Sequence, residues 1–278
     1  FRQLLQPIPR ESLSRAHIAL LRFALEFIEG RTAGEINTIV QQYEAGCKIA
    51  DIQRRTGGDE PSRDELLARA RLYQTLQMWG ESYQHLATAL ATESDAALDQ
   101  TLAVDIWLTI SPKLILEGRL DEYHSGCRIV LDVLGPNVSP TIAERLCKTA
   151  CLLPDVVDTG RLPIAQLTAS VEAMQVSSGL KPWACATIAL VAYRQGDIDT
   201  MLEYTNRSLA SQPVLLCEAL AQTLLALAEH RQGNSDTAAR EMIVAKELVS
   251  EASASQPEHR DTAIAKILLR ESEQLLQE

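Results

Sequence analysis

One phrase occurs twice near the end of this chain, and its spacing constrains the fold more than any other feature of the sequence. Residues 182–213 read as two amphipathic helices joined by a turn at Gly196, and the next segment repeats the pattern around Gly233. Glycine suits a helix C-terminus, where the backbone often needs a positive φ, and Asp197 can cap the helix that follows. The two glycines are 37 residues apart (233 − 196 = 37), close to the period of about 34 residues of a common helix–turn–helix repeat. The sequence therefore predicts a stack of helical hairpins.

Two earlier segments follow the same pattern. Residues 105–135 read as a helical pair in which Trp107 stands eleven residues before Gly118. Residues 65–94 read as another pair, in which Gln77 stands where the glycine is expected. Because both segments carry apolar residues at helical spacing, we expect each of them to form a hairpin. In the later segment, the residues expected on the inner face of the second helix are Leu120, Tyr123, Cys127 and Val130.

The remaining segments fit the repeat less well. Residues 140–176 read as a degenerate helical pair, and residues 10–50 hold a further pair around Gly30. Residues 51–64 contain glycine and proline breakers and are the best candidate for a linker. Residues 259–278 read as one long amphipathic helix. Such a helix can cover the exposed core at the end of a solenoid with its polar face outward.

These segments predict an all-α solenoid of about five to six helical hairpins with a C-terminal capping helix. We expect residues 61–278 to form this repeat domain and residues 1–60 to form an N-terminal helical region that matches the repeat poorly. The composition agrees with this fold class. Hydrophobic residues make up 46% of the chain, enough for a continuous core, while aromatic residues make up only 4%, which disfavours a β fold.

Charge and cysteine usage limit the partners and the compartment. The formal net charge of −11 disfavours nucleic acid and anionic membranes and favours a basic or neutral partner. The sequence contains no run of about 18 apolar residues, so we expect no membrane insertion by this segment. The six cysteines form no CxxC pair and lie mostly in apolar helical runs, which indicates a reducing, cytoplasmic environment. The chain starts at Phe1 rather than at a methionine, and we expect it to be part of a longer protein.

The helical units resemble tetratricopeptide (TPR) repeats. From about Asp64 to Glu278, the order of phrases is similar to the TPR tails of planctomycete-type bacterial Ser/Thr protein kinases and related multidomain proteins. The phrases that carry this resemblance include ILEGRLDEYHSGCRIVLDVLG, PTIAERLCKTACLLPDVVD and VAYRQGDIDTMLEYTNRSLA. The resemblance implies a C-terminal regulatory or assembly module joined to another domain, and it does not supply a ligand. The sequence lacks the kinase signatures themselves, namely the glycine-rich phosphate loop, HRD and DFG.

Motifs that would carry chemistry are missing from the sequence. It contains no P-loop, GxGxxG, HExxH, GxSxG or CxxC motif, so we expect neither an enzyme nor a cofactor. Cys147 and Cys151 are four residues apart on a predicted helix and could supply half of a zinc site. A tetrahedral site needs two further ligands, and no histidine or cysteine lies near in sequence. We therefore favour simple packing for this pair and expect no metal site.

The concave face of a TPR array, lined by the first helix of each pair, is its usual binding surface. The residues expected to face this groove and to bind a partner are Arg71, Gln74, Asp105, Trp183, Tyr193, Arg194, His230 and Arg231. In the last two units a ring stands beside an arginine, which suits a grip on a carboxylate or phosphate. The alternative is that each arginine only complements the dipole at the end of its helix. Trp183 is either an anchor for a partner or packs on a neighbouring turn or helix.

The leading functional hypothesis is a non-catalytic scaffold that binds a peptide or partner domain in this groove. One alternative is a module that drives homo-oligomerisation, which a large apolar patch on the outer face would favour. A second alternative is a sensor of a small ligand, which would need a closed pocket with convergent polar groups.

Overall fold

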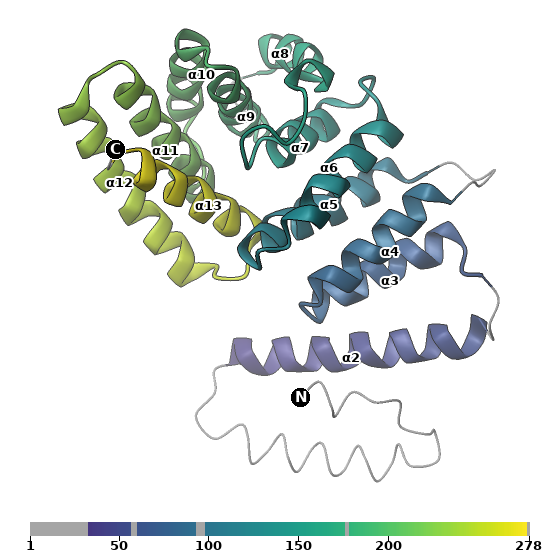
Figure 1. Cartoon of the computed structure of the whole chain (residues 1–278). Helices are drawn as coiled ribbons and strands as arrows, with labels where there is room; N and C mark the ends of the chain where they lie inside the picture. Colours follow the sequence, from purple (N-terminus) through teal and green to yellow (C-terminus); the bar gives the residue numbers. More distant parts are fainter. Residues whose placement is uncertain (1–32, 57–59, 93–97, 176–177, 277–278) are drawn as a thin grey trace. The chain divides into compact units, whose positions relative to one another are not determined.

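The computed structural model describes residues 33–56, 60–92, 98–175 and 178–276 (Figure 1). In these residues the chain forms twelve α-helices and one 3-10 turn and contains no strand. The all-α class expected from the sequence is confirmed. Most of the helical pair expected around Gly30 lies outside the described residues.

Two compact units make up the chain, residues 1–94 (unit 1) and residues 95–278 (unit 2). Unit 1 contains α2 (Ala33–Thr56), α3 (Arg63–Thr75) and α4 (Trp79–Ala91). The division expected between residues 60 and 61 falls inside unit 1, where α3 packs against both α2 and α4.

The linker predicted for residues 51–64 is shorter than expected, because α2 continues through residue 56. The glycine pair that breaks helices most strongly comes only after Thr56. The next helix then begins with a capping box, in which Ser62 and Glu65 satisfy each other's backbone N–H groups.

In unit 1, the turn between α3 and α4 uses Gln77 where three hairpins of unit 2 use glycine. Gln77 has φ = 57°, while Gly118, Gly196 and Gly233 have φ values of 74°, 73° and 82°. A side chain in this left-handed region costs about 1–2 kcal/mol. The hairpin keeps the same turn conformation and closes with a hydrogen bond of 2.9 Å from Ser82 Oγ to the Ala70 carbonyl.

We expect Gln77→Gly to raise the free energy of unfolding by about 0.5–1 kcal/mol, because the relief of left-handed strain exceeds the entropy that glycine loses on folding. Urea unfolding followed by far-UV circular dichroism would measure it. Gly196→Ala should have the opposite effect of similar size, and a loss of stability in Gln77→Gly would contradict this account.

Unit 2 consists of four helical hairpins and a final helix. The two helices predicted within residues 182–213 are present: the first ends at Gln195 and the second occupies residues 198–210, with Gly196 in the turn between them. The elements are α5 (Gln100–Leu116), α6 (Leu120–Leu134), α7 (Pro140–Ala150), the 3-10 turn η2 (Thr159–Arg161), α8 (Ile164–Ala173), α9 (Lys181–Gln195), α10 (Ile198–Ala210), α11 (Leu215–Arg231), α12 (Ser235–Ser255) and α13 (Arg260–Leu275).

Side chains inside each hairpin hold its two helices together. In the α5–α6 hairpin, the rings of Trp107 and Tyr123 stack with their centroids 6.2 Å apart, and both are fully buried. Cys127 and Val130 are buried as expected, but the prediction for Leu120 is wrong, since its side chain is 42% exposed. Leu120 is the first residue of α6, so it lies at the rim of the hairpin rather than on its inner face.

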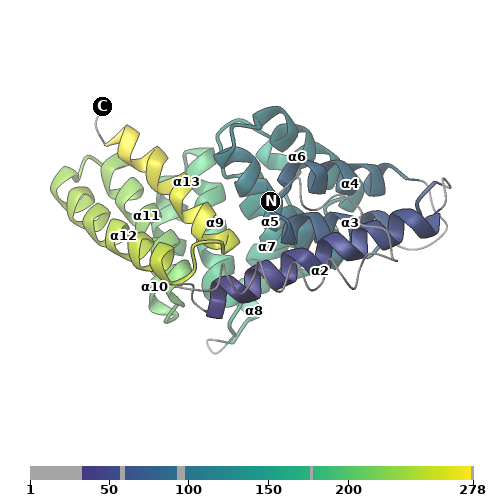
Figure 2. The same cartoon turned by 90° about the horizontal axis from the view of Figure 1, so that it is seen from below.

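The inner helices of unit 2 form a closed ring. Helix α5 packs against α7, α7 against α9, α9 against α11, α11 against α13, and α13 against α5. In both views α13, in yellow, lies beside α11 (Figure 1, Figure 2). The outer helices α6, α8, α10 and α12 each pack against the inner helix that precedes them.

The prediction that the final helix caps the end of the array is therefore wrong in its position. A capping helix buries only one face. In α13 the five consecutive residues 261–265 are all buried, and because five residues span more than one turn, the helix is buried on every side there. Because α13 also contacts α5, it lies against the inner face of the hairpins and closes them into the ring. Ala265 and Leu268, both fully buried, form part of this contact layer.

Candidate functional site

Among the described residues of unit 2, cavities lie at both ends of the ring of inner helices. The first cavity has a volume of about 550 Å³. We call it the N-end cavity, because the first turns of α9, α11 and α13 line it, together with α7 from Thr141 to Lys148. Its main lining residues are Leu108, Glu144, Arg145, Lys148, Leu180, Trp183, Leu215, Leu216, His259, Arg260 and Asp261. The second cavity has a volume of about 560 Å³. We call it the C-end cavity, because the last turns of α5, α9, α11 and α13 line it. Its main lining residues are Leu116, Pro154, Tyr193, Arg194, Arg231, Ile267, Arg270, Glu271 and Leu275.

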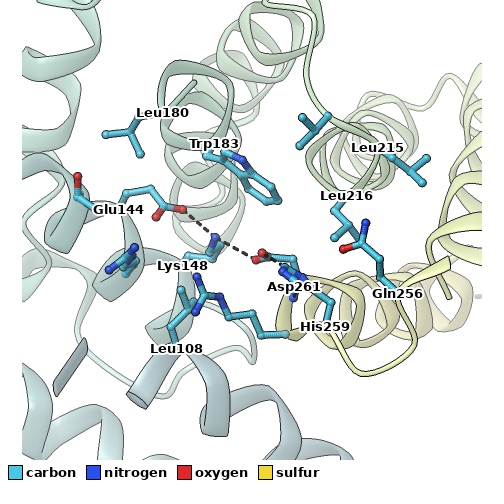
Figure 3. A pocket seen from close by; sticks show the side chains of 14 residues that line it. Leu108, Glu144, Lys148, Leu180, Trp183, Leu215, Leu216, Gln256, His259 and Asp261 are labelled. Atoms are coloured by element: carbon cyan, nitrogen blue, oxygen red, sulfur yellow. Dashed lines mark hydrogen bonds and ion pairs between the residues drawn. The ribbon is translucent and has the colours of Figure 1, made fainter. Parts of the chain in front are cut away.

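Lys148 lies at the centre of the N-end cavity wall, between two carboxylates (Figure 3). Its Nζ is 2.9 Å from a Glu144 oxygen and 3.2 Å from an Asp261 oxygen. The same Nζ lies 4.5 Å from the centroid of the Trp183 ring. The lysine side chain is only 4% exposed. Burial alone lowers its pKa, but the two carboxylates outweigh burial and hold the pKa above its ordinary value. Lys148 is therefore an ammonium ion at neutral pH, unable to act as a nucleophile or a base.

Neighbouring groups fix the Glu144 carboxylate and the backbone of Asp261. The hydroxyl of Thr187, on α9, donates to Glu144 over 3.2 Å. The backbone N–H of Asp261 donates to Nδ1 of His259 over 3.2 Å, so His259 serves as the N-cap of α13. These contacts join α7, α9 and α13 at one point.

A second charged group lies beside the first. Asp105 Oδ1 is 3.0 Å from Nη1 of Arg145 and 3.5 Å from Nη1 of Arg260. The contact with Arg145 is an ion pair that lacks hydrogen-bond geometry. Arg145 Nη1 is buried and makes no hydrogen bond. Nε of Arg260 is likewise buried without a hydrogen-bond partner. The predicted groove residue Asp105 thus holds two arginines of the N-end cavity.

Arg194 and Tyr193 lie at the C-end cavity and grip a carboxylate of the chain itself. Arg194 binds Glu271 with both Nη atoms, one of them over 2.7 Å. It also donates to the carbonyls of Cys151 and Leu152, over 2.8 Å and 2.9 Å. The Tyr193 hydroxyl donates to Glu271 over 2.9 Å, and the guanidinium carbon of Arg194 lies 4.8 Å from the centroid of the Tyr193 ring. The expected pairing of an arginine with a ring and a carboxylate is present, but the carboxylate comes from α13.

The other predicted binding residues fall into separate places. Trp183 lines the N-end cavity and Arg231 lines the C-end cavity. His230 is half-buried in the last turn of α11. Arg71 and Gln74 lie on α3 in unit 1, where Arg71 is exposed and Gln74 is half-buried.

Five charged residues of the N-end cavity are missing from the sequence-based list of binding residues: Glu144, Arg145, Lys148, Arg260 and Asp261. A local signal did exist for two of them, because Glu144 and Lys148 are four residues apart among apolar positions of one helix. Asp261 had no such signal, since 113 residues separate it from Lys148.

The cysteines of the chain differ sharply in accessibility. Cys127, Cys147, Cys151, Cys185 and Cys217 are buried, and Cys47 on α2 is exposed. The described residues contain no group of three His, Cys, Asp or Glu side chains placed to hold a metal ion. Within the described residues, no helix has the length and apolar content needed to span a membrane.

We expect one thiol per chain to react with a disulfide reagent in the native state, and all six after unfolding. Reaction needs an accessible thiolate, whereas burial raises the pKa of Cys127 to about 12. Absorbance during reaction with Ellman's reagent near pH 8 would count the thiols. Cys47→Ser should leave no rapidly reacting thiol, and a second rapid thiol in that variant would contradict the burial.

We also expect stability to fall at alkaline pH. Burial raises the pKa of Cys151 and Cys217 to about 12, from an ordinary value of 9.0. Because these pKa values are higher in the folded state, the thiols contribute stability below about pH 9, and that contribution is lost as the pH rises towards 12. Melting temperatures measured at intervals from about pH 7 to 11 should stay level and then drop. Cys47→Ser should show the same drop, and a level profile throughout would argue against it.

No protein-family model matches the chain, and no curated protein matches it either. The relation to TPR repeats therefore stays a prediction from the sequence phrases.

Proposed function

We propose that this chain is a non-catalytic binding module and that unit 2 holds its ligand in the N-end cavity. One observation carries the proposal: α13 closes the inner helices into a ring and leaves a cavity of about 550 Å³ lined by buried ions and apolar side chains. Small-molecule sites have volumes of about 300–1,000 Å³ and combine an apolar lining with a few placed polar groups.

The same ring argues against a peptide lying along an open groove of unit 2. Leu190, Thr223 and Leu227 occupy first-helix positions that would face such a groove, and all three are fully buried. Helix α13 packs against α11, which carries two of them. A ligand of unit 2 is therefore better accommodated in a cavity than along the helices.

The chemistry of the buried groups supports binding rather than catalysis. Lys148 is held in its charged form by the adjacent carboxylates. The buried cysteines are held as neutral thiols, which are poor nucleophiles. Activated nucleophiles need the opposite shifts in pKa.

For the parent protein, we propose a TPR-like origin and a role as a regulatory or assembly module of a larger bacterial signalling protein in the cytoplasm. The support is the resemblance of the hairpin phrases and the net charge of −11, which disfavours nucleic acid. Self-assembly has weaker support. Among the described residues, the large apolar side chains that are exposed are scattered: Leu120 and Val133 lie at opposite ends of α6, and only Ile243 and Val244 on α12 are neighbours.

A thermal-shift screen of the full chain would test the proposal. The panel would contain amino acids and short peptides, dicarboxylates, nucleotides and sugar phosphates. A ligand present at one hundred times its Kd should stabilise the fold by about 2.7 kcal/mol. Leu180→Trp should abolish the shift, because Leu180 lines the N-end cavity and is half-exposed, so the larger ring can fill the space.

The matched control is Leu120→Trp, which adds the same ring at an exposed position of α6. It should leave the shift unchanged. The proposal fails if no compound stabilises the native chain, or if Leu180→Trp folds and responds as the native chain does.

A further inference from the structure

The charged side chains around the N-end cavity form two groups, one with a net positive charge and one with a net negative charge. In the first group, Arg145 and Arg260 share the single carboxylate of Asp105, at 3.0 Å and 3.5 Å. Two guanidinium ions on one carboxylate leave a surplus of one positive charge. Both arginines line the cavity, and Asp105 is not among its lining residues.

In the second group the signs are reversed. Glu144 and Asp261 share the single ammonium of Lys148, at 2.9 Å and 3.2 Å, and the three side chains are 4%, 9% and 4% exposed. Two carboxylates on one ammonium leave a surplus of one negative charge. Each carboxylate contacts Lys148 through one oxygen, Oε1 or Oδ1. The second oxygen of Asp261, Oδ2, lies 3.6 Å from Nδ1 of His259, which accepts a hydrogen bond from the Asp261 N–H and so does not donate to Oδ2. The second oxygen of each carboxylate can therefore accept a hydrogen bond.

The two groups face the same space and lie close together. Glu144 is followed directly by Arg145 on α7, and Arg260 is followed directly by Asp261 on α13. A ligand that meets both groups must therefore carry its two charges within a compact frame.

The rest of the cavity wall is apolar. Leu108 and Leu180 line it, together with the ring of Trp183 and with Leu215 and Leu216 at the start of α11. Figure 3 shows Trp183 and Leu216 on the side of the cavity beyond Lys148. An aliphatic or aromatic group of a ligand would be desolvated there.

We infer that the N-end cavity binds a zwitterion with an apolar side chain, namely a free amino acid or a short peptide with both termini unblocked. The ligand carboxylate binds Arg145 and Arg260, the ligand ammonium binds the second oxygens of Glu144 and Asp261, and the side chain lies against the leucines and Trp183. This inference rests on the proposed function and adds the chemical class of the ligand.

A ligand with one charge would meet only half of this site. A plain anion would pair with the arginines and would bring a like charge near Glu144 and Asp261, which costs binding energy in a buried site. A plain cation would do the same to the arginines.

Isothermal titration calorimetry of the full chain with three related probes tests the inference. Unblocked Leu-Leu carries both charges, N-acetyl-Leu-Leu carries only the carboxylate, and Leu-Leu amide carries only the ammonium. We expect the Kd of unblocked Leu-Leu to be lower than that of either blocked form by at least about tenfold, the effect of one charge-assisted hydrogen bond.

Arg260→Gln should weaken the binding of unblocked Leu-Leu by at least about tenfold and leave that of Leu-Leu amide nearly unchanged. The matched control is Arg161→Gln, which removes an arginine from an exposed ion pair with Asp132 in the same unit. It should not change any of the three affinities. If Arg260→Gln does not fold, Arg145→Gln replaces it, and the three probes on the native chain decide the question without any variant.

Equal affinity for N-acetyl-Leu-Leu and unblocked Leu-Leu would overturn the inference, since the site would then recognise the ligand carboxylate and not the ammonium. The inference would also fail if none of the three probes binds, while another compound binds the native chain and does not bind Leu180→Trp. That result would leave the proposed function in place. If no compound of any class binds the native chain, the proposed function fails as well.

Discussion

Lys148→Met is expected to lower the free energy of unfolding by about 3–5 kcal/mol, the largest effect we anticipate for a single substitution in this chain. The methionine keeps most of the volume of the lysine stem, so the loss is electrostatic rather than a packing defect. Without the ammonium, the carboxylates of Glu144 and Asp261, on side chains only 4% and 9% exposed, are left with no cation between them. Chemical unfolding of the native chain and the variant, compared at the same pH, would measure the difference.

A triple variant, Glu144→Gln/Lys148→Met/Asp261→Asn, separates this explanation from a general intolerance of the site. Because it removes all three charges, no buried ion remains unpaired, and we expect it to recover more than half of the loss. If the triple variant is less stable than Lys148→Met, the buried ion network does not account for the effect. In the native chain the pKa of Lys148 is raised, so its contribution is present at neutral pH and disappears only above about pH 10.5, its ordinary value.

Arg194→Ala is expected to cost about 3 kcal/mol, close to the first effect in size. The arginine side chain is 6% exposed and joins three segments: α9, the carbonyls that follow α7, and α13 through Glu271. Its removal leaves the Glu271 carboxylate with the Tyr193 hydroxyl but no cation, and takes the arginine donor from the carbonyls of Cys151 and Leu152. Arg194→Lys should recover only part of the loss, because an ammonium lacks the planar set of donors that reaches all of these acceptors.

The matched control for this second prediction is Arg161→Ala. Arg161 also pairs with a carboxylate, Asp132, but the two side chains are 49% and 60% exposed. Such pairs contribute about 0–1 kcal/mol. An arginine that is free to bind an external anion would contribute as little to the free energy of unfolding as Arg161 does. A cost below about 1 kcal/mol for Arg194→Ala would therefore make Arg194 a candidate binding residue again.

These two expectations show where sequence reasoning about the site succeeded and where it did not. The pairing of Tyr193 with Arg194 as a carboxylate grip was a sound inference about chemistry. It assigned the carboxylate to a partner, because the sequence gives no indication that Glu271, 77 residues further along, lies within hydrogen-bond distance of Arg194. Trp183, expected to bind a partner, lines the N-end cavity. The charged residues around it come from α7 and α13, and the sequence does not indicate that these helices meet at Trp183.

The hairpins of this protein could be predicted from the sequence alone. Their turns depend on a few neighbouring residues: a glycine with positive φ such as Gly196, a cap such as Asp197, and apolar residues at helical spacing. These signals act within one or two turns of helix, so a linear pattern contains them in full. Even the exception at Gln77 was visible in the sequence as a missing glycine.

The closure of the ring was decided only by the tertiary structure. The side of the array on which α13 lies depends on the curvature that accumulates over four successive hairpins, and each packing angle varies with the side chains at its contact. No local sequence pattern indicates the total curvature. The contact of Lys148 with Asp261 spans 113 residues and that of Arg260 with Asp105 spans 155. The sequence determined which helices form, and packing across these separations determined that they enclose a charged cavity.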